Sequence, residues 1–165
     1  MKDNALFFVP VVNRDAHAHI SDTYDAVKEF ARTRKNRHHY GIEECGDDNE
    51  SDIGVDLNRN YGFEFAHDDT GSDIHPCNDS YRGPFAFSEP ETQAMKNLVT
   101  RFDNIKVAVN LHARDKAGPL FITPFNFDVE ENHLLEDDFR EAKKFYEKIF
   151  HEGAEPLGYT TGNGA

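Results

Sequence analysis

The residues best suited to binding chemistry lie in the run Gly54–Tyr61, which reads GVDLNRNY. Asn58 and Arg59 place an amide donor beside a planar guanidinium group, and this pair is suited to holding a carboxylate from two directions. In an extended run Asp56 would point to the side opposite Arg59, where it could orient another group. The same run is also typical of a turn in which Asn and Asp bond to the backbone. A carboxylate-binding site and a plain turn are both compatible with these residues.

Two further residues are candidates for chemistry. His112 ends the apolar run Ile105–His112, and α/β sheets place functional groups at the ends of their strands. Because the chain has nine histidines, His112 could equally be a core or surface residue. Arg34 belongs to the basic segment Arg32–His39, whose alternative interpretation is a solvated face.

Three apolar runs predict the strands that would position these residues. They are Leu6–Val12, Ile105–His112 and Leu120–Thr123. A helix is predicted from Ser88-Glu89-Pro90-Glu91, with Ser88 as N-cap and Glu91 as its capping-box partner. A second helix is predicted over Glu131–Glu152. Strands alternating with helices predict an α/β fold.

The intervening segments lack a clear period. We expect loops over Glu43–Asp52 and Tyr61–Pro84, and Gly158–Ala165 is a Gly-rich end with no terminating signal of its own.

Length and charge restrict the class of protein. The 165 residues suffice for one domain with a core. With 18 basic and 31 acidic residues the net charge is −13, which argues against nucleic acid and anionic membranes as partners. No apolar run approaches the ~18 residues of a membrane-spanning helix, and Leu6–Val12 is too short for a signal peptide.

Taken together, the motifs resemble a known family. GVDLNRN is followed by Tyr81-Arg82-Gly83-Pro84 and by Ser88-Glu89-Pro90-Glu91, and Arg34-Lys35-Asn36-Arg37 precedes it. In this order the chain resembles the catalytic domain of zinc metallocarboxypeptidases of the carboxypeptidase A/B type. The resemblance implies an α/β fold with a mixed, twisted sheet flanked by helices and incomplete at both ends. Residues 1–165 would be the central part of one catalytic domain, with no second domain.

The resemblance also implies roles for individual residues. Asn58 and Arg59 would hold the C-terminal carboxylate of a peptide or protein substrate, and Arg34 would stabilise the oxyanion. His112 would be the third ligand of one Zn²⁺ ion. Asp56 would orient a zinc-bound histidine.

The other zinc ligands of the family come from a His-x-x-Glu motif that precedes the strand equivalent to Leu6–Val12. We expect this chain to lack that motif, which would leave Asp56 without its partner, and to lack the general-base Glu. The family removes the C-terminal residue of a peptide by zinc-activated water. The chain alone is therefore expected to be inactive, and to fold weakly because sheet edges would be unpaired. The alternatives are a catalytically dead carboxylate-binding module without its metal, and a chain whose site is completed by a separate segment.

Cys45 and Cys77 are the only cysteines. They could be two unrelated buried thiols, but the resemblance implies a disulfide between them. Asn49-Glu50-Ser51 and Asn78-Asp79-Ser80 match the N-glycosylation sequon. The disulfide and the sequons favour a secreted or lysosomal protein.

Overall fold

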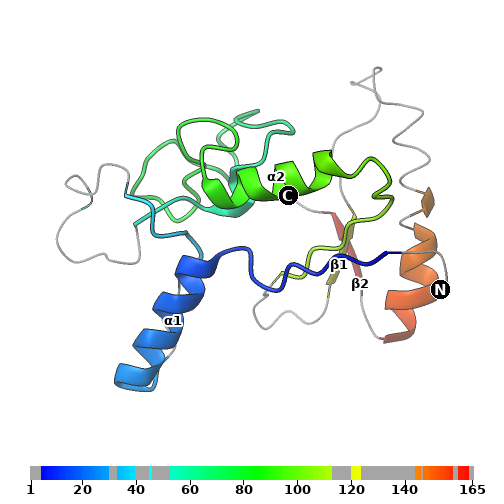
Figure 1. Cartoon of the computed structure of the whole chain (residues 1–165), viewed down its shortest axis with the longest axis horizontal. Helices are drawn as coiled ribbons and strands as arrows, with labels where there is room; N and C mark the ends of the chain where they lie inside the picture. The colour runs from blue at the N-terminus through cyan, green and yellow to red at the C-terminus, as the bar shows by residue number, and fades with distance from the viewer. Residues whose placement is uncertain are drawn as a thin grey trace. The chain divides into compact units, whose positions relative to one another are not determined.

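Figure 1 shows a computed structural model of the chain. The structure describes residues 5–29, 33–39, 45, 53–112, 120–123, 144–145, 147–157 and 160–163. The chain divides into two compact units, Met1–Lys106 and Val107–Ala165.

Helix α1, Arg14–Val27, opens the regular structure of the first unit. The Asn13 side chain caps it by accepting a hydrogen bond from the Ala16 N–H, and Asp15 in the first turn complements the helix dipole. The helix ends at Lys28, which adopts the left-handed conformation and donates its N–H to the Tyr24 carbonyl.

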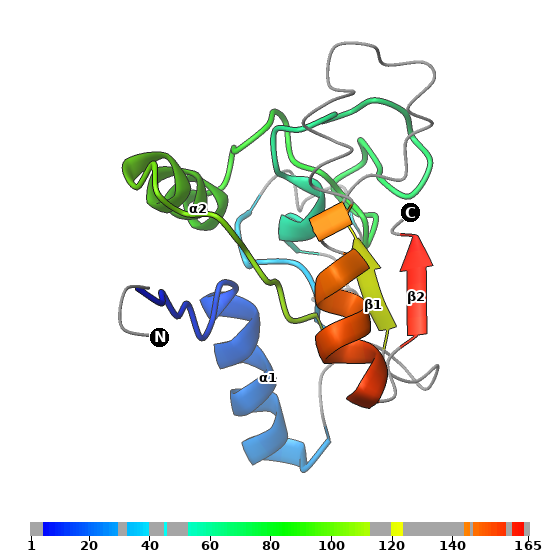
Figure 2. The ribbon, with the colours of Figure 1, turned by 90° about the vertical axis from the view of Figure 1, so that its right-hand side faces the viewer.

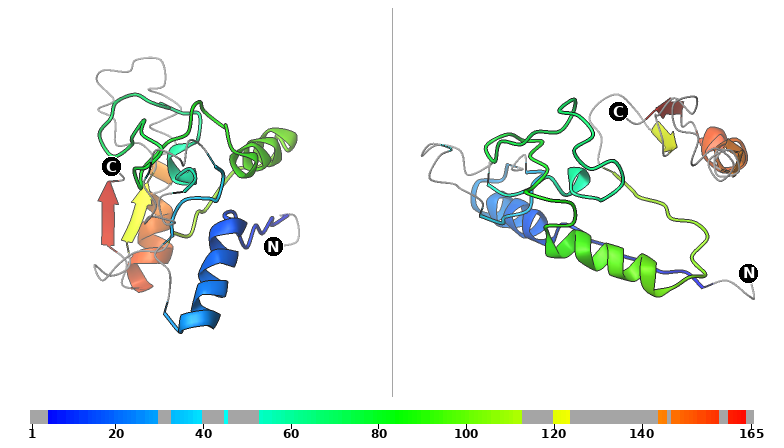
Figure 3. Two further views of the ribbon diagram at one scale, coloured as in Figure 1. Left: turned by 90° about the vertical axis from the view of Figure 1, so that its left-hand side faces the viewer. Right: turned by 90° about the horizontal axis from the view of Figure 1, so that it is seen from above.

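Helix α2, Pro90–Arg101, follows the loops of residues 53–89 (Figure 3). Its N-cap is Glu89, with Pro90 in the first turn and no side-chain hydrogen bond to the cap. The predicted capping box is therefore wrong. Ser88 does not cap the helix, because its hydroxyl donates to Glu89 Oε1 at 2.7 Å. Proline at the first helical position has no N–H to be capped, which reduces the need for a side-chain cap.

The loops between the two helices carry the buried centre of the first unit. They contain the short 3₁₀-helix η3, Leu57–Arg59, and one isolated bridge between Asp73 and Tyr81. Within the described residues, Tyr61–Pro84 contains no helix or strand, as predicted. The buried apolar side chains of this region are Ile53, Val55, Leu57 and Tyr81.

The second unit contains a pair of parallel strands, β1 (Leu120–Thr123) and β2 (Thr160–Asn163) (Figure 2). Their register runs from Leu120 opposite Thr160 to Thr123 opposite Asn163. The strand predicted over Leu120–Thr123 is confirmed. The Gly-rich segment Gly158–Ala165 contains β2.

Helical structure in the second unit covers residues 144–145 and 147–149 and then changes geometry. A π-helical turn, η4, spans Phe150–Ala154, and a 3₁₀ turn, η5, spans Glu155–Leu157. Much of the helix predicted over Glu131–Glu152 lies outside the described residues, as does the loop predicted over Glu43–Asp52 apart from Cys45. No helix in the described part of the chain has both the length and the apolar character needed to span a membrane.

The predicted fold class is wrong for the part of the chain that the structure describes. In place of a mixed, twisted sheet flanked by helices, the described residues form only the two-stranded pair β1–β2. Leu6–Val12 and Ile105–His112 form no strand, and Phe8 and Leu111 are 82% and 91% exposed. An apolar β-branched run indicates that a segment suits a strand. The strand itself also requires a neighbour to pair its backbone N–H and C=O groups.

Candidate carboxylate-binding site

The GVDLNRN run folds as a capped turn centred on η3. The backbone N–H of Asp56 donates to the Tyr81 carbonyl at 2.8 Å, which fixes the entry to the turn. Asp56 Oδ1 then accepts the N–H of Asn58 at 3.0 Å, and the Asp56 carbonyl accepts the N–H of Arg59 at 2.9 Å. The turn that the sequence allowed is thus present, and it sets Asn58 and Arg59 side by side.

Asp56 also pairs with Arg34. Arg34 Nη2 donates to Asp56 Oδ2 at 2.6 Å, and the Asp56 side chain is only 3% exposed. The pair is a charge-assisted hydrogen bond, which anchors the partly exposed Arg34 beside η3. Both carboxylate oxygens of Asp56 therefore accept hydrogen bonds, from Arg34 and from the Asn58 N–H.

Asn58 and Arg59 differ in how firmly they are held. The Asn58 side chain is exposed, and within the described residues its amide group makes no hydrogen bond. Arg59 Nε donates to the Gly71 carbonyl, and Arg59 Nη1 donates to the Asn58 carbonyl at 3.1 Å. These bonds orient the guanidinium group and leave it further N–H groups for a ligand.

The turn rests on a close approach between two segments of backbone. Gly54 has φ +105°, and a Cβ atom there would overlap the carbonyl of Asn36. The Asn36 N–H donates to the Val55 carbonyl at 2.9 Å, and Asn36 Oδ1 accepts the Val55 N–H at 2.8 Å. Only glycine satisfies this geometry. The segment that carries Arg34 is thereby bound to the segment that carries Asp56.

Asn60 connects the turn to the start of α2. Its fully buried Nδ2 group donates to the Arg82 carbonyl and to Ser88 Oγ, both at 2.8 Å. Its Oδ1 accepts from the Glu89 N–H at 3.2 Å and from the Thr92 hydroxyl at 2.6 Å. One side chain therefore fixes η3, the loop after Arg82 and the first turn of α2 together.

Glu89 is a fully buried carboxylate behind the site. Burial by itself would raise the pKa of Glu89, but hydrogen bonds from Asn36, Ser88 and His38, together with the charge of His38, lower the pKa below its ordinary value. Asn36 Nδ2 lies 2.7 Å from Glu89 Oε2, and His38 Nδ1 lies 2.8 Å from the same oxygen. The carboxylate therefore stays ionised in the interior.

Sequence reasoning missed Asn36, Asn60 and Glu89 as supporting residues. Residue type does not distinguish a buried carboxylate or amide from an exposed one. The available signal was the density of hydrogen-bonding side chains around Gly54 and before Pro90.

His112 lies in the second unit and its side chain is exposed. The structure thus brings Arg34, Asp56, Asn58 and Arg59 together in the first unit and does not relate His112 to them. The part of the chain that is described contains no group of three His, Cys, Asp or Glu side chains able to hold a metal ion. The described residues therefore do not by themselves form a zinc site.

The expectation that the chain lacks a His-x-x-Glu spacing needs a correction. His133 and Glu136 have this spacing. They follow His112 in the sequence, whereas the family motif precedes the equivalent of Leu6–Val12. Both residues lie outside the described part of the chain.

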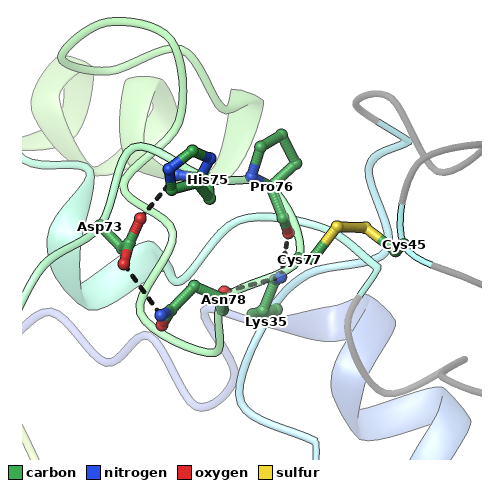
Figure 4. The surroundings of a disulfide bond; sticks show 7 residues. All are labelled: Lys35, Cys45, Asp73, His75, Pro76, Cys77 and Asn78. Atoms are coloured by element: carbon green, nitrogen blue, oxygen red, sulfur yellow. Dashed lines mark hydrogen bonds between the residues drawn. A yellow bond between two sulfur atoms is a disulfide. The ribbon is translucent and has the colours of Figure 1, made fainter.

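Cys45 and Cys77 form a disulfide with a Cα–Cα distance of 5.2 Å (Figure 4). This is the pairing that the family resemblance implied. It joins the Pro76–Asn78 turn to the segment before Gly54, so that the loop containing the candidate site is closed covalently.

Comparison with known proteins identifies the family. The family model described as zinc carboxypeptidase matches residues 1–163. Carboxypeptidase A6 of Homo sapiens is 35% identical over 113 residues, which are 67% of this chain and 22% of that protein. Carboxypeptidase A1 of Rattus norvegicus is 31% identical over 131 residues, 78% of this chain and 26% of that protein.

A shorter match is closer in sequence. Carboxypeptidase A5 of Macaca fascicularis is 43% identical over 61 residues, 37% of this chain and 14% of that protein. The chain thus spans only about a quarter or less of the length of these relatives. With the family model matching nearly its whole length, the chain belongs to the zinc carboxypeptidase family.

Proposed function

We propose that this chain supplies the carboxylate-binding part of a metallocarboxypeptidase, which removes the C-terminal residue of a peptide or protein by hydrolysis. The observation that carries the proposal is the η3 turn. It holds the exposed Asn58 next to the oriented guanidinium of Arg59. A terminal carboxylate is the ligand that an amide donor and a guanidinium fork would grip together.

Arg34 and Asp56 have supporting roles in this proposal. Arg34 would place a second positive charge near the bound carboxylate end, where it can stabilise negative charge forming on the scissile carbonyl oxygen. Asp56 would position both Arg34 and the η3 turn through its two carboxylate oxygens. Burial of Asp56 strengthens these contacts because less water competes for them.

The disulfide supports a secreted or lysosomal location, because disulfides persist in oxidising compartments. The substrate would then be a peptide or protein C-terminus met in such a compartment.

Binding of matched ligands tests the carboxylate site. We would titrate the chain with N-benzoyl dipeptides carrying different C-terminal side chains, and with their C-terminal amides, by isothermal titration calorimetry. The free acids should bind and the amides should not. Arg59→Ala should weaken acid binding about 10- to 100-fold, since a hydrogen bond to a charged group contributes about 1.5–3 kcal/mol. Asn58→Ala should have a smaller effect in the same direction.

Arg14→Ala is the matched control, because it also removes one positive charge but lies on α1. Equal affinity for acids and amides would overturn the proposal. So would an Arg59→Ala variant that binds no more weakly than Arg14→Ala.

The second candidate function is a catalytically dead module that binds carboxylates. The Arg34–Asp56 ion pair favours this second candidate. In it Arg34 binds Asp56 in place of an oxyanion, and Asp56 binds Arg34 in place of a zinc-bound histidine. For the chain alone both candidates predict no hydrolysis of N-benzoyl dipeptides with added Zn²⁺. The two differ if a segment supplying the remaining zinc ligands is joined to this chain, because only the first candidate then predicts hydrolysis of these substrates.

Measuring the zinc stoichiometry of the purified chain tests whether the chain by itself forms a metal site. We expect no stoichiometric zinc on the purified chain, because the described residues lack a ligand set. One bound zinc that is lost in His112→Ala would show that the site is completed from within the chain. Loss of that zinc in His133→Ala as well would assign the second ligand.

A further inference from the structure

Asn78 lies in a tight turn beside the disulfide, and the proposed function leaves its sequence motif unexplained. Asn78-Asp79-Ser80 matches the acceptor motif for N-linked glycosylation. The Asn78 side chain is exposed. Its Oδ1 atom accepts hydrogen bonds from the Ser80 hydroxyl at 2.8 Å and from the Ser80 N–H at 2.9 Å. The asparagine and the serine of the motif are therefore in direct contact.

The backbone of this turn is fixed from its buried side (Figure 4). The fully buried Lys35 donates from Nζ to the carbonyls of Pro76 and Asn78, at 2.6 and 2.9 Å. Cys77 between them is bonded to Cys45. The carbonyls are thus held by Lys35, and the Asn78 side chain remains exposed.

We propose that Asn78 carries an N-linked glycan. The disulfide supports the compartment that this modification needs, because the lumen in which disulfides form is also the one that receives glycans. The group donor would be an oligosaccharide attached to a lipid through a diphosphate. A bond would form between Asn78 Nδ2 and C1 of the first sugar, while the bond between C1 and the diphosphate oxygen breaks. Nδ2 loses one proton, the lipid diphosphate leaves, and nothing is oxidised or reduced.

The contacts of Asn78 suit this reaction. Hydrogen bonds on Oδ1 stabilise the negative charge that builds on that oxygen as Nδ2 loses its proton. Ser80 supplies two such donors. The serine of the motif therefore stabilises the acceptor amide through direct hydrogen bonds.

The contacts also suit the product. Nδ2 donates to Asp73 Oδ2 at 2.9 Å in the unmodified turn, and a glycosylated amide retains one N–H that can keep this bond. Because the side chain is exposed, the sugar would extend into solvent and displace no packed group. The inference does not depend on the carboxylate-binding function.

The test is to direct the full chain into the secretory pathway of a eukaryotic cell with an added leader. Peptide N-glycosidase then removes N-glycans and leaves Asp where a glycosylated Asn stood, so peptide mass spectrometry locates the site. We expect conversion at Asn78 in the unaltered chain. It should vanish in Ser80→Ala and persist in Ser80→Thr, which keeps the hydroxyl.

Two further variants control the measurement. Asn78→Gln should remove a glycan-dependent shift in electrophoretic mobility. Asn97→Gln should not, because Asn97 is exposed on α2 and has no motif around it. Total cell protein is assayed, so a variant that folds poorly is still scored. An unmodified Asn78, or conversion that survives Ser80→Ala, would overturn the proposal.

Discussion

At the scale of single residues, the site depends on polar side chains that are buried and fully paired. Asn36, Asn60 and Glu89 are each at most 1% exposed. Buried polar groups are tolerated when their hydrogen bonds are satisfied, and such networks then favour one arrangement over its alternatives. Here the network determines where η3 stands, and with it the positions of Asn58 and Arg59.

Glu89→Gln tests this network. The NH₂ group of the new glutamine would face either the Asn36 amide donor or the Ser88 hydroxyl donor. One buried hydrogen bond would then be replaced by two donors that face each other. We expect the free energy of unfolding to fall by about 1–3 kcal/mol at neutral pH. Urea denaturation followed by circular dichroism would measure it. Glu29→Gln, at an exposed position after α1, should change stability little.

The lowered pKa of Glu89 predicts that the stability of the chain depends on pH. The pKa of Glu89 is lower in the folded chain than its ordinary value of 4.5, so the ionised carboxylate stabilises the fold above that value. This stabilisation is lost as the pH falls from about 4.5 through the folded pKa. The difference in unfolding free energy between the wild-type chain and Glu89→Gln should therefore shrink in acid. A difference that stays constant down to low pH would contradict this assignment.

At the scale of elements, Gly54 and its contact with Asn36 hold the site segments together. We expect Gly54→Ala to destabilise the chain by about 3–5 kcal/mol, because it combines a left-handed backbone with overlap against the Asn36 carbonyl. Gly71→Ala is the comparison. Its φ is +76° but no atom lies within 4 Å of the added Cβ, so about 1–2 kcal/mol is expected. Thermal denaturation would measure the stability of both variants. Equal losses of stability would show that the close approach of Gly54 to the Asn36 carbonyl contributes nothing.

Local motifs could be predicted from the sequence, but tertiary pairings could not. The β1 strand over Leu120–Thr123 was predicted, and so was a helix near Pro90. The start of α2 was misplaced by one residue because Ser88 and Glu89 bond to each other instead of capping the helix. Leu6–Val12 was predicted as a strand on composition, although a strand depends on a partner that no local pattern supplies.

In the candidate site, too, local features could be predicted and tertiary contacts could not. The proximity of Asn58 and Arg59 follows from adjacency in the chain, so the sequence could predict it. The Arg34–Asp56 pair joins residues 22 positions apart, and it was not predicted. It depends on the glycine contact and on Asn36, whose burial no residue pattern revealed.

At the scale of the whole molecule, the first unit is closed by one covalent link. The Cys45–Cys77 disulfide joins residues 32 positions apart and encloses η3 within its loop. A bond across a loop of this length restricts the unfolded chain, which corresponds to about 3–4 kcal/mol of stability.

Reduction of this disulfide should therefore lower the free energy of unfolding by about 3–4 kcal/mol, because the unfolded chain regains freedom. Urea denaturation with and without a reducing agent would measure the change. The double variant Cys45→Ala, Cys77→Ala should already have the lower stability and should not respond to the reducing agent. If reduction leaves the unfolding midpoint unchanged, the loop closure has no role in stability.

Because Lys35 is buried, its reactivity in covalent footprinting can report on the loop that the disulfide closes. Its ammonium group is enclosed by the carbonyls of Pro76 and Asn78 and lies over the Tyr81 ring. An amine-acylating reagent needs an accessible amine, so Lys35 should resist labelling in the native chain. Lys28, whose side chain is 68% exposed, should label at once. The ratio of the two acylated peptides would then report, at a single residue, whether the turn beside the disulfide has closed.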